Sequence, residues 1–318
     1  MLGFTTAAES SLDAFLSASA GSRYQKQLRD YAESLLRQEL TKPGWCLLAM
    51  QAGTPVARAA LWAPPGQDVP TDTVLIEADW SDAELSDGHE VLAKAHDLAG
   101  ELGADNLAHS VDSPPASPQY QEDEDARIRL LEGAGYGLLR DGLRWRYSGS
   151  SPEERREEPS LVFRPLPEVG EEAFVAAGAR RIFASTYEGT RDSWLSKAIE
   201  EHGPAGAAQA DFRDAQAMEH RPDWWELAYT EDGAVAGVIM VSRSPSTAVI
   251  YYVGVVPEHR GRGVATLLVR RGTERLVEDG ATEIRGDCDR DNIGMVKGFE
   301  RAGYEQFARR RTYQRSIR

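Results

Sequence analysis

Apolar and polar residues follow one another through the second half of the chain in a pattern typical of mixed strands and helices. Short apolar runs predict strands over residues 161–164, 225–229, 235–241, 248–256 and 282–288, and the tail 304–315 can pair as a last strand. Helical spacing of apolar residues predicts helices over residues 171–184, 190–202, 264–279 and 293–302. One of these strands, 248–256, is almost wholly apolar, so we expect it at the centre of a sheet.

The first half shows the same kinds of pattern with weaker signals. Residues 73–79 predict a strand and residues 91–102 a helix, with a polar loop between them. Residues 112–125 contain three prolines and an acidic run, which predicts an internal surface loop. Residues 148–159 are polar, charged and nearly free of apolar side chains, so they predict a linker near the midpoint.

Two short matches between the halves indicate a duplicated domain. The matched pairs are Leu131–Tyr136 with Phe299–Tyr304, and Trp45 and Gly53 with Trp225 and Gly233. They occur in the same order and at similar offsets, as expected for two copies of one domain. We therefore predict domains over residues 1–147 and 160–318.

Composition and charge narrow the class of protein. The chain has 318 residues, 41% of them hydrophobic and 27% charged, which is ordinary for a globular protein of two domains. No apolar run approaches the ~20 residues of a membrane span, and no signal-peptide pattern opens the sequence, so we expect a cytoplasmic protein without a membrane partner. A net charge of −15 argues against nucleic acid and is compatible with a cationic amine. Cys46 and Cys288 are expected in the core, not in a disulfide or zinc site.

The most informative segment joins the apolar central strand to the helix that follows it. Gly261 and Gly263 lack side chains, so ligand oxygens can approach the backbone at this turn. The helix N-terminus offers unpaired N–H groups and a positive dipole end, and Arg260 and Arg262 add cationic donors. These features predict a pyrophosphate cradle. The turn is not a Walker A loop, because it has no Lys-Ser/Thr pair, and its glycine spacing is shorter than that of a dinucleotide fingerprint.

Two segments resemble the GNAT superfamily of N-acetyltransferases. Arg260–Ala265 fits the family pattern Arg/Gln-x-x-Gly-x-Gly/Ala, and Asn292–Tyr304 is similar to the family segment Asn-x-x-Ala-x-x-Leu-Tyr-Glu-Lys-x-Gly-Phe. The resemblance covers the second half of the chain. It implies an α/β (α+β) fold of two GNAT-like domains, each a mixed, mostly antiparallel sheet flanked by helices, in the tandem arrangement of mycothiol synthase-type proteins.

The resemblance also implies how acetyl-CoA binds as a cosubstrate, without a metal. The backbone of Val255 and Val256 would pair with the pantetheine arm, and Asn292 would contact the pantetheine or the sulfur end. The turn and the first helical residues would surround the pyrophosphate, namely Arg260, Gly261, Arg262, Gly263, Val264, Ala265 and Thr266.

An amine must lose a proton before it attacks the thioester, so a base is expected. The family position of a carboxylate base corresponds to Asp287; alternatively, Asp287 is a strand-end residue that helps to cap the next helix. The family tyrosine that protonates the thiolate corresponds to Phe299. Either Tyr251 or Tyr252 acts in its place through water, or the coenzyme A thiolate leaves without an acid.

The resemblance predicts an acyl-CoA-dependent N-acyltransferase, with acetyl transfer to an amine by direct attack in a ternary complex. The acceptor would be a small-molecule or peptide amine, bound by Glu188 and Asp192 unless these are ordinary acids of a helix start, and the enzyme a monomer or homodimer. The alternative, motivated by Phe299, is a catalytically weak coenzyme A sensor or partner-binding pseudoenzyme.

The first half lacks the cradle. Its equivalent loop, residues 80–90, carries four acids, one glycine and no arginine; the acids are Asp82, Glu84, Asp87 and Glu90. An acidic loop repels pyrophosphate. We therefore expect a degenerate GNAT-like domain that has lost cofactor binding and helps to form the wall of the acceptor site.

Overall fold

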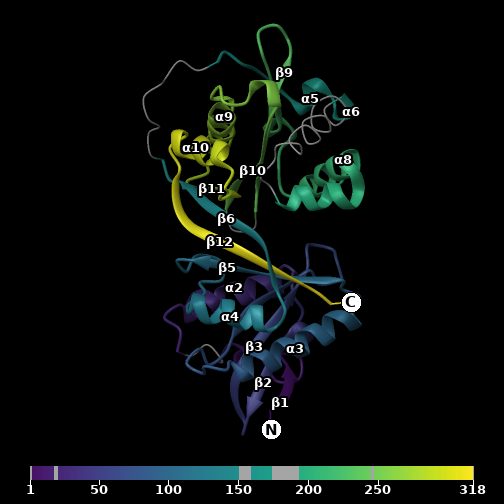
Figure 1. Ribbon diagram of the computed structural model, residues 1–318, viewed down its shortest axis with the longest axis vertical. Coiled ribbons are helices and arrows are strands. Elements are labelled where there is room, and N and C mark those ends of the chain that lie inside the picture. The colour runs from purple at the N-terminus through teal and green to yellow at the C-terminus, as the bar shows by residue number, and fades with distance from the viewer. Residues whose placement is uncertain (1, 18–20, 150–158, 174–192, 245–246, 318) are drawn as a thin grey trace. The chain divides into compact units, whose positions relative to one another are not determined.

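The computed structural model describes residues 2–17, 21–149, 159–173, 193–244 and 247–317 (Figure 1). It divides into two compact units. The N-terminal unit comprises Met1–Asp141 together with Ala308–Arg318, and the C-terminal unit comprises Gly142–Phe307. The chain therefore leaves the first unit once and returns to it for its last residues.

In the N-terminal unit, the described strands form a sheet in the order β1-β2-β3-β4-β5-β12. They are β1 (Gly3–Thr6), β2 (Cys46–Gln51), β3 (Thr54–Trp62), β4 (Asp72–Glu77), β5 (Asn106–Ser113) and β12 (Glu305–Ser316). Strands β4 and β5 run parallel, and the other neighbours run antiparallel.

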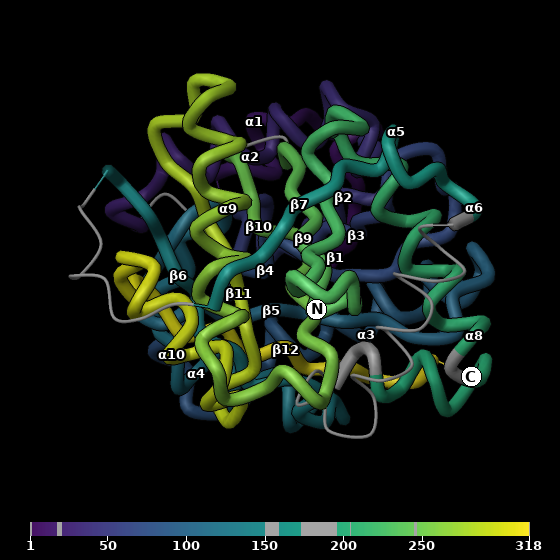
Figure 2. Tube along the Cα trace, turned by 90° about the horizontal axis from the view of Figure 1, so that it is seen from above, coloured from purple at the N-terminus to yellow at the C-terminus, as the bar shows by residue number. Residues whose placement is uncertain are grey.

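Helices cover both faces of this sheet and bury an apolar core on each (Figure 2). One face is covered by α1 (Leu12–Ser17) and α2 (Gln25–Arg37), and the other by α3 (Ser86–Glu101) and α4 (Glu124–Gly133). Helix α2 buries Leu28, Ala32 and Leu35, whose spacing places them on one helical stripe.

The C-terminal unit repeats this plan in the order β7-β8-β9-β10-β11-β6. Its strands are β7 (Val162–Pro165), β8 (Glu226–Tyr229), β9 (Val235–Arg243), β10 (Ala248–Val255), β11 (Ile284–Asp289) and β6 (Gly137–Tyr147). Here β10 and β11 run parallel and the other described neighbours antiparallel. The predicted class, two mixed and mostly antiparallel sheets flanked by helices, is confirmed.

The helices of the C-terminal unit also cover two faces (Figures 1 and 2). One face carries α9 (Val264–Glu278) and α10 (Ile293–Arg301); the other carries α8 (Ser193–Gln216), with α5 (Leu166–Val169) and α6 (Glu171–Ala173) beside it. Glu226 on β8 is fully buried and holds α9 against the sheet, because Arg271 and Arg275 donate to its carboxylate at 2.7–2.8 Å.

The two halves of the chain exchange their last strands. Residues 142–147 of β6 pair with β11 in the C-terminal unit, and residues 309–316 of β12 pair with β5 in the N-terminal unit. The compact units therefore differ from the predicted domains at both ends, since residues 142–147 and 308–318 each belong to the unit built mainly from the other half.

The predicted duplication is visible where α4 and α10 end. Gly135 and Gly303 both have φ of +85°. The N–H of the next residue, Tyr136 or Tyr304, donates in both cases to the carbonyl five residues back, at 3.0 Å. Both tyrosines are buried, so the same helix end anchors an aromatic side chain in each core.

Some predicted elements differ from the structure. The predicted helix 190–202 is observed as α8, which extends to Gln216 through a kink at Gly203, and most of the predicted helix 171–184 lies outside the described residues. Helix α3 begins at Ser86, five residues earlier than predicted. Both cysteines are buried in the core, as predicted. In the part of the chain that the structure describes, no helix has the length and hydropathy needed to cross a membrane.

Candidate functional site

Strands β10 and β11 pair only at their first residues and then separate. The parallel register covers Ala248 with Ile284 and Val249 with Arg285, whereas β10 continues along β9 and β11 along β6 to the strand ends. An extra residue at Tyr251 forms a bulge where the strands part. We call this separation the strand opening. The strand opening explains why most residues in the second half of β10 are only partly buried, although β10 lies inside the sheet as predicted.

Backbone groups of β10 line the strand opening in an alternating pattern. Val256 does not contribute, because its N–H donates to the Ala236 carbonyl at 3.0 Å and its carbonyl accepts from the His259 N–H at 2.9 Å. Since Val256 faces β9, antiparallel alternation directs the groups of Val253 and Val255 toward the opposite edge. The backbone groups of Val253 and Val255 thus face the strand opening, whereas those of Val256 are held by β9 and by the turn.

The turn before α9 presents a row of unpaired backbone N–H groups. Gly261 and Gly263 have φ of +74° and +85°, and a Cβ at either position would meet nothing within 4 Å. No side chain caps α9, and none of the described residues accepts a hydrogen bond from the N–H groups of residues 261–266. Six successive donors at a helix N-terminus can bind a diphosphate.

The two arginines of the turn differ in their surroundings. Arg262 is exposed, whereas Arg260 is half-buried and donates from Nε to the Val255 carbonyl at 3.2 Å. Arg260 therefore ties the turn to the end of β10 in addition to placing a positive charge near the N–H row. Both arginine side chains therefore lie at the turn and give it a positive charge, as the sequence predicts.

Asn292 precedes α10, the helix that packs on the first turn of α9. The Asn292 Oδ1 accepts from the Met295 N–H at 3.2 Å, so this side chain is the N-cap of α10. At Gly298 an added Cβ would lie 3.5 Å from Ala265 Cβ and 3.9 Å from the Thr266 nitrogen. This close packing fixes α10 against the first turn of α9. Because Oδ1 of Asn292 caps the helix, the NH₂ group of its side chain is the part that can contact a ligand.

Asp287 lies on the face of β11 opposite Phe299. Its neighbour Gly286 contacts the Phe299 ring, where an added Cβ would lie 2.6 Å away, so alternation directs Asp287 toward the α8 face. The Asp287 carboxylate is 34% exposed and forms an ion pair with the buried Arg144 on β6, at 3.6 Å. Phe299 is fully buried and stacks on Trp145 with ring centroids 5.7 Å apart, which makes it a core residue.

Tyr251 also contacts the α8 face. Its hydroxyl donates to Asp211 Oδ1 of α8 at 3.4 Å, which brings a second carboxylate to the point where the strands part. Sequence reasoning missed Asp211, since α8 has no amphipathic pattern and no motif marks this position. Glu188 and Asp192, the predicted acceptor-binding acids, lie outside the described residues.

The equivalent turn of the N-terminal unit is occupied by its own carboxylates. Asp82 accepts from the N–H groups of Glu84 and Ser86 at 3.0 and 2.9 Å, and Asp79 accepts from the Ser81 N–H at 2.9 Å. The hydrogen bond from Ser86 is the main cause that holds the pKa of Asp82 below its ordinary value. Side-chain oxygens of the chain thus take the place that a phosphate would need.

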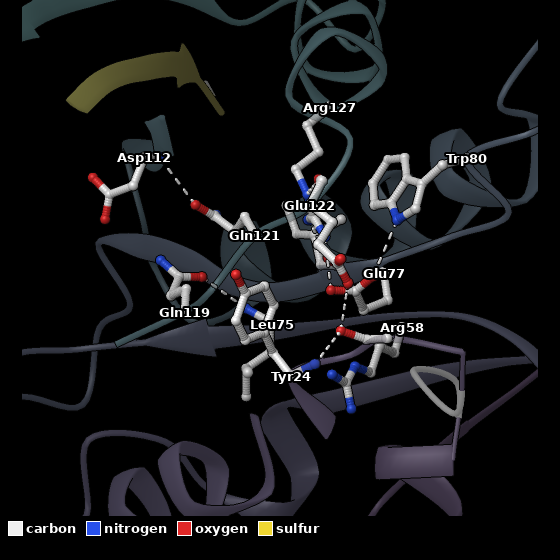
Figure 3. Close-up of polar contacts among 12 residues, drawn as sticks. Tyr24, Arg58, Leu75, Glu77, Trp80, Asp112, Gln119, Gln121, Glu122 and Arg127 are labelled. Atoms are coloured by element: carbon white, nitrogen blue, oxygen red, sulfur yellow. Dashed lines mark hydrogen bonds and ion pairs between the residues drawn. The ribbon is translucent and has the colours of Figure 1, made fainter. Parts of the chain in front are cut away.

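The strand opening of the N-terminal unit is filled as well (Figure 3). Strands β4 and β5 are paired only at Asp72 and Ala108. Side chains from the residues that follow β5 bond to the strand edges that are left unpaired. On β4, the Leu75 N–H donates to Gln119 Oε1 at 3.2 Å, and the Ile76 carbonyl accepts from Arg127 at 2.6 Å. On β5, Gln121 Nε2 donates to the Ser110 carbonyl at 2.8 Å, and Gln121 Oε1 accepts from the Asp112 N–H at 3.2 Å. Gln119 and Gln121 are buried, so the predicted surface loop 112–125 is wrong for these residues.

The second half of the chain is similar to known acetyltransferases. Residues 173–304 match the Acetyltransferase (GNAT) family, the family that the two segments were predicted to resemble. Over 88 residues, 28% of this chain, it is 33% identical to acetyltransferase SG1711 of Sodalis glossinidius and 31% identical to acetyltransferase ECA0875 of Pectobacterium atrosepticum. The chain spans 61% and 62% of the length of these two relatives.

Solved structures extend the likeness to both units. A GCN5-related N-acetyltransferase from Sphaerobacter thermophilus has a TM-score of 0.62 at 19% identity and covers all of this chain and 96% of its own. A tandem GNAT protein from the clavulanic acid biosynthesis pathway has a TM-score of 0.53 at 16% identity, over 100% and 99% of the two chains. These likenesses support a tandem GNAT fold over the full length.

Proposed function

We propose that this protein is an acyl-CoA-dependent N-acyltransferase that transfers an acetyl group to an amine. The observation that carries the proposal is the row of six N–H groups at residues 261–266, beside a strand opening, in a segment that matches the GNAT family. The N–H row binds the pyrophosphate, and the edge of β10 at Val253 and Val255 pairs with the pantetheine amides. Asn292 contacts the sulfur end through its free amide group.

The chemistry is direct attack in a ternary complex. The amine nitrogen forms a bond to the thioester carbonyl carbon, the carbon–sulfur bond breaks, and the thiolate takes up a proton. Asp287 accepts the proton that the ammonium group loses, and Tyr251 supplies a proton to the thiolate through water. The contact between Tyr251 and Asp211 supports this role, because a hydrogen-bonded carboxylate orients the hydroxyl. The acceptor is a small-molecule or peptide amine.

The N-terminal unit has a structural role in the proposed enzyme and binds no acyl-CoA. Its turn holds Asp82 where phosphate would bind, and Gln119 occupies the edge where pantetheine would pair. Calorimetry with acetyl-CoA is expected to give one site per chain. Two equivalent sites would contradict this assignment.

An amine screen tests the activity. Release of free thiol from acetyl-CoA is measured with a panel of amines, and Arg260→Glu serves as the binding variant. We expect this variant to weaken acetyl-CoA binding by about 1–3 kcal/mol, since a charge-assisted contact becomes a repulsive one. An unchanged Kd would contradict the cradle.

The alternative is a coenzyme A sensor or pseudoenzyme. It is favoured by Phe299, which is buried in the core and has no hydroxyl to protonate a thiolate. Tight acetyl-CoA binding without thiol release across the panel would support this alternative over the enzyme.

A further inference from the structure

Three arginines surround one phenylalanine ring in the C-terminal unit. The guanidinium carbons of Arg144 and Arg146, both on β6, lie 4.9 and 5.7 Å from the centroid of the Phe307 ring. The guanidinium carbon of Arg285 on β11 lies 5.2 Å from the same centroid. Phe307 is in the first residues of β12 and belongs to the C-terminal unit. We call these four residues the Phe307 cluster.

The Phe307 cluster shares one face of the sheet with the candidate base. Strands β6 and β11 lie side by side (Figure 1), and Arg144 is the cross-strand partner of Asp287. Arg146, two residues further on, is the partner of Arg285. Trp145 packs against α10 on the other face, so alternation directs both arginines of β6 toward the face of Asp287. Residues two apart on a strand are about 7 Å apart, which is the distance between these two cross-strand pairs.

Carboxylates balance only part of this positive charge. Arg144 forms its ion pair with Asp287 at 3.6 Å, and Arg285 pairs with Glu283 at 2.7 Å. In the part of the chain that the structure describes, no carboxylate pairs with Arg146, and its Nε is shielded from solvent without a hydrogen-bond partner. The side chain of Arg146 is half-buried, so the end of its guanidinium is the accessible part. Like charges directly opposite one another destabilise a sheet, and an anion at Arg146 would relieve this repulsion.

The local charge determines which amines can approach Asp287. A primary amine is a cation at neutral pH, as lysine is, and a positive cluster beside the base repels it. An acceptor with an anionic group at its other end reverses this effect, because that group binds the cluster and the ammonium group is left for Asp287. The net charge of −15, which is compatible with a cationic amine, therefore does not describe this face of the sheet.

We propose that the acceptor is an anionic amine, whose carboxylate or phosphate group binds Arg146 in the Phe307 cluster while its amino group lies at Asp287. This inference rests on the proposed transferase activity and names the class of its acceptor. The guanidinium end offers paired N–H donors that match the oxygens of either anion. A spacing of about 7 Å suits a short linear amino acid or an aminoalkyl phosphate. Arg146 is then a residue that selects the acceptor and takes no part in proton transfer.

The test measures thiol release from acetyl-CoA by the full chain with matched amines. The carboxylate arm compares β-alanine, γ-aminobutyrate and δ-aminovalerate with their neutral amides, and the phosphate arm compares phosphoethanolamine with ethanolamine. We expect the anionic member of at least one arm to have a KM about tenfold or more below that of its neutral match, the scale of a charge-assisted hydrogen bond. The arm that shows the difference identifies the anion.

Variants of Arg146 locate the preference. Arg146→Gln should raise the KM of the anionic amine by about tenfold and leave its kcat, the KM of the neutral match and the Kd of acetyl-CoA within about twofold. Arg146→Lys should raise the same KM less, because an ammonium group keeps the charge but not the paired donors. Arg164→Gln is the matched control, since Arg164 also lies over an aromatic ring, that of Tyr229 at 5.2 Å, on β7 of the same unit. It should leave both amines unchanged.

The outcomes separate this proposal from the proposed function. Equal KM values for anionic and neutral amines, or an Arg146→Gln variant that affects both alike, would overturn the anionic acceptor and leave the transferase intact. If Arg146→Gln does not fold, an unchanged KM in Arg146→Lys overturns it instead. If no amine is turned over, the proposed function fails, and calorimetry with γ-aminobutyrate and phosphoethanolamine decides on the site. Binding that Arg146→Gln abolishes and Arg164→Gln retains would support it, and no binding would overturn it.

Discussion

At the scale of single residues, the sequence identified candidate site residues but not the contacts that each of them makes in the folded chain. Asp287 was predicted by counting back from the family segment that begins at Asn292, and that reasoning could not include its ion pair with Arg144, which comes from a strand more than a hundred residues away. Val256 was expected as a cofactor contact, together with Val255, because the family resemblance implies it. Which edge of a strand a backbone group faces depends on the partner strand, so the sequence could not distinguish Val256 from Val253.

Replacing Asp287 separates catalysis from structure. If Asp287 is the general base, Asp287→Asn should lower kcat/KM by ~10² or more and leave the Kd of acetyl-CoA within about twofold. If it only pairs with Arg144, the variant should lose thermal stability and keep activity in proportion to folded protein. Both kcat/KM and Tm are measured on one preparation.

The matched control for this variant is Glu283→Gln. It removes the ion pair with Arg285, which the structure gives at 2.7 Å, and Glu283 has no proposed catalytic role. Wild-type kcat/KM in folded Asp287→Asn would end the assignment of the base and direct attention to Asp211.

Asp72 on β4 should make the stability of the protein depend on pH. Burial is the main cause that raises its pKa from 3.8 to about 6, against the opposing effects of Thr71 and Arg310. A raised pKa means that the folded state favours the protonated acid. The stabilisation is therefore complete below about pH 4 and is lost as the pH rises to 6 and above.

Asp72→Asn removes the titration while keeping the oxygen that accepts from Thr71. The variant should match the wild type below about pH 4 and exceed its free energy of unfolding by about 1–3 kcal/mol at pH 7. Urea unfolding at pH 4, 5, 6 and 7 measures the difference. The exposed Asp68, whose pKa is lowered chiefly by its hydrogen bond to Lys42, is the control, and Asp68→Asn should give no gain at pH 7.

Among the elements, the C-terminal strands and helices were the most predictable. Their apolar spacing marks the elements themselves, and Gly280 and Gly303 mark the ends of two helices. Both glycines have the positive φ that commonly ends a helix. The predicted match of Trp45 with Trp225 was off by one residue. The short 3-10 turns Pro43–Trp45 and Pro222–Trp224 are equivalent in the two halves, so the residue that corresponds to Trp45 is Trp224. The filled opening of the N-terminal unit has no sequence signal, since glutamines that bond to strand edges are ordinary polar residues.

The cradle element offers a matched pair of glycines. Gly263 precedes α9 and Gly280 follows it, with φ of +85° and +84°, and an added Cβ meets nothing within 4 Å at either position. Alanine should cost each variant a similar ~1 kcal/mol of stability, because both positions are left-handed. Only Gly263→Ala adds a methyl group to the N–H row, so only this variant should raise the Kd of acetyl-CoA, by about fivefold or more. Equal Kd values in the two variants would contradict the cradle.

At the scale of the whole molecule, the exchange of strands was beyond the reach of sequence periodicity. The alternation in residues 137–147 and 305–316 predicts strands but not the sheet in which each one pairs. The boundary predicted at the polar linker is therefore displaced from the boundary of the compact units. A sequence repeat identifies two copies of a fold, whereas the partner of each terminal strand is a property of the assembled chain.

This exchange predicts how fragments behave. A fragment of residues 158–318, cut at the predicted linker, lacks β6 and so leaves the edge of β11 unpaired, and it carries residues 309–316 without their partner β5. Unpaired edges promote aggregation, so this fragment should be poorly soluble. A fragment of residues 142–307 retains β6 beside β11 and omits the orphan strand, so it should be more soluble and bind acetyl-CoA. Sedimentation and calorimetry on both fragments measure the difference, and a monomeric 158–318 fragment with the Kd of the full chain would show that the exchanged strands are dispensable.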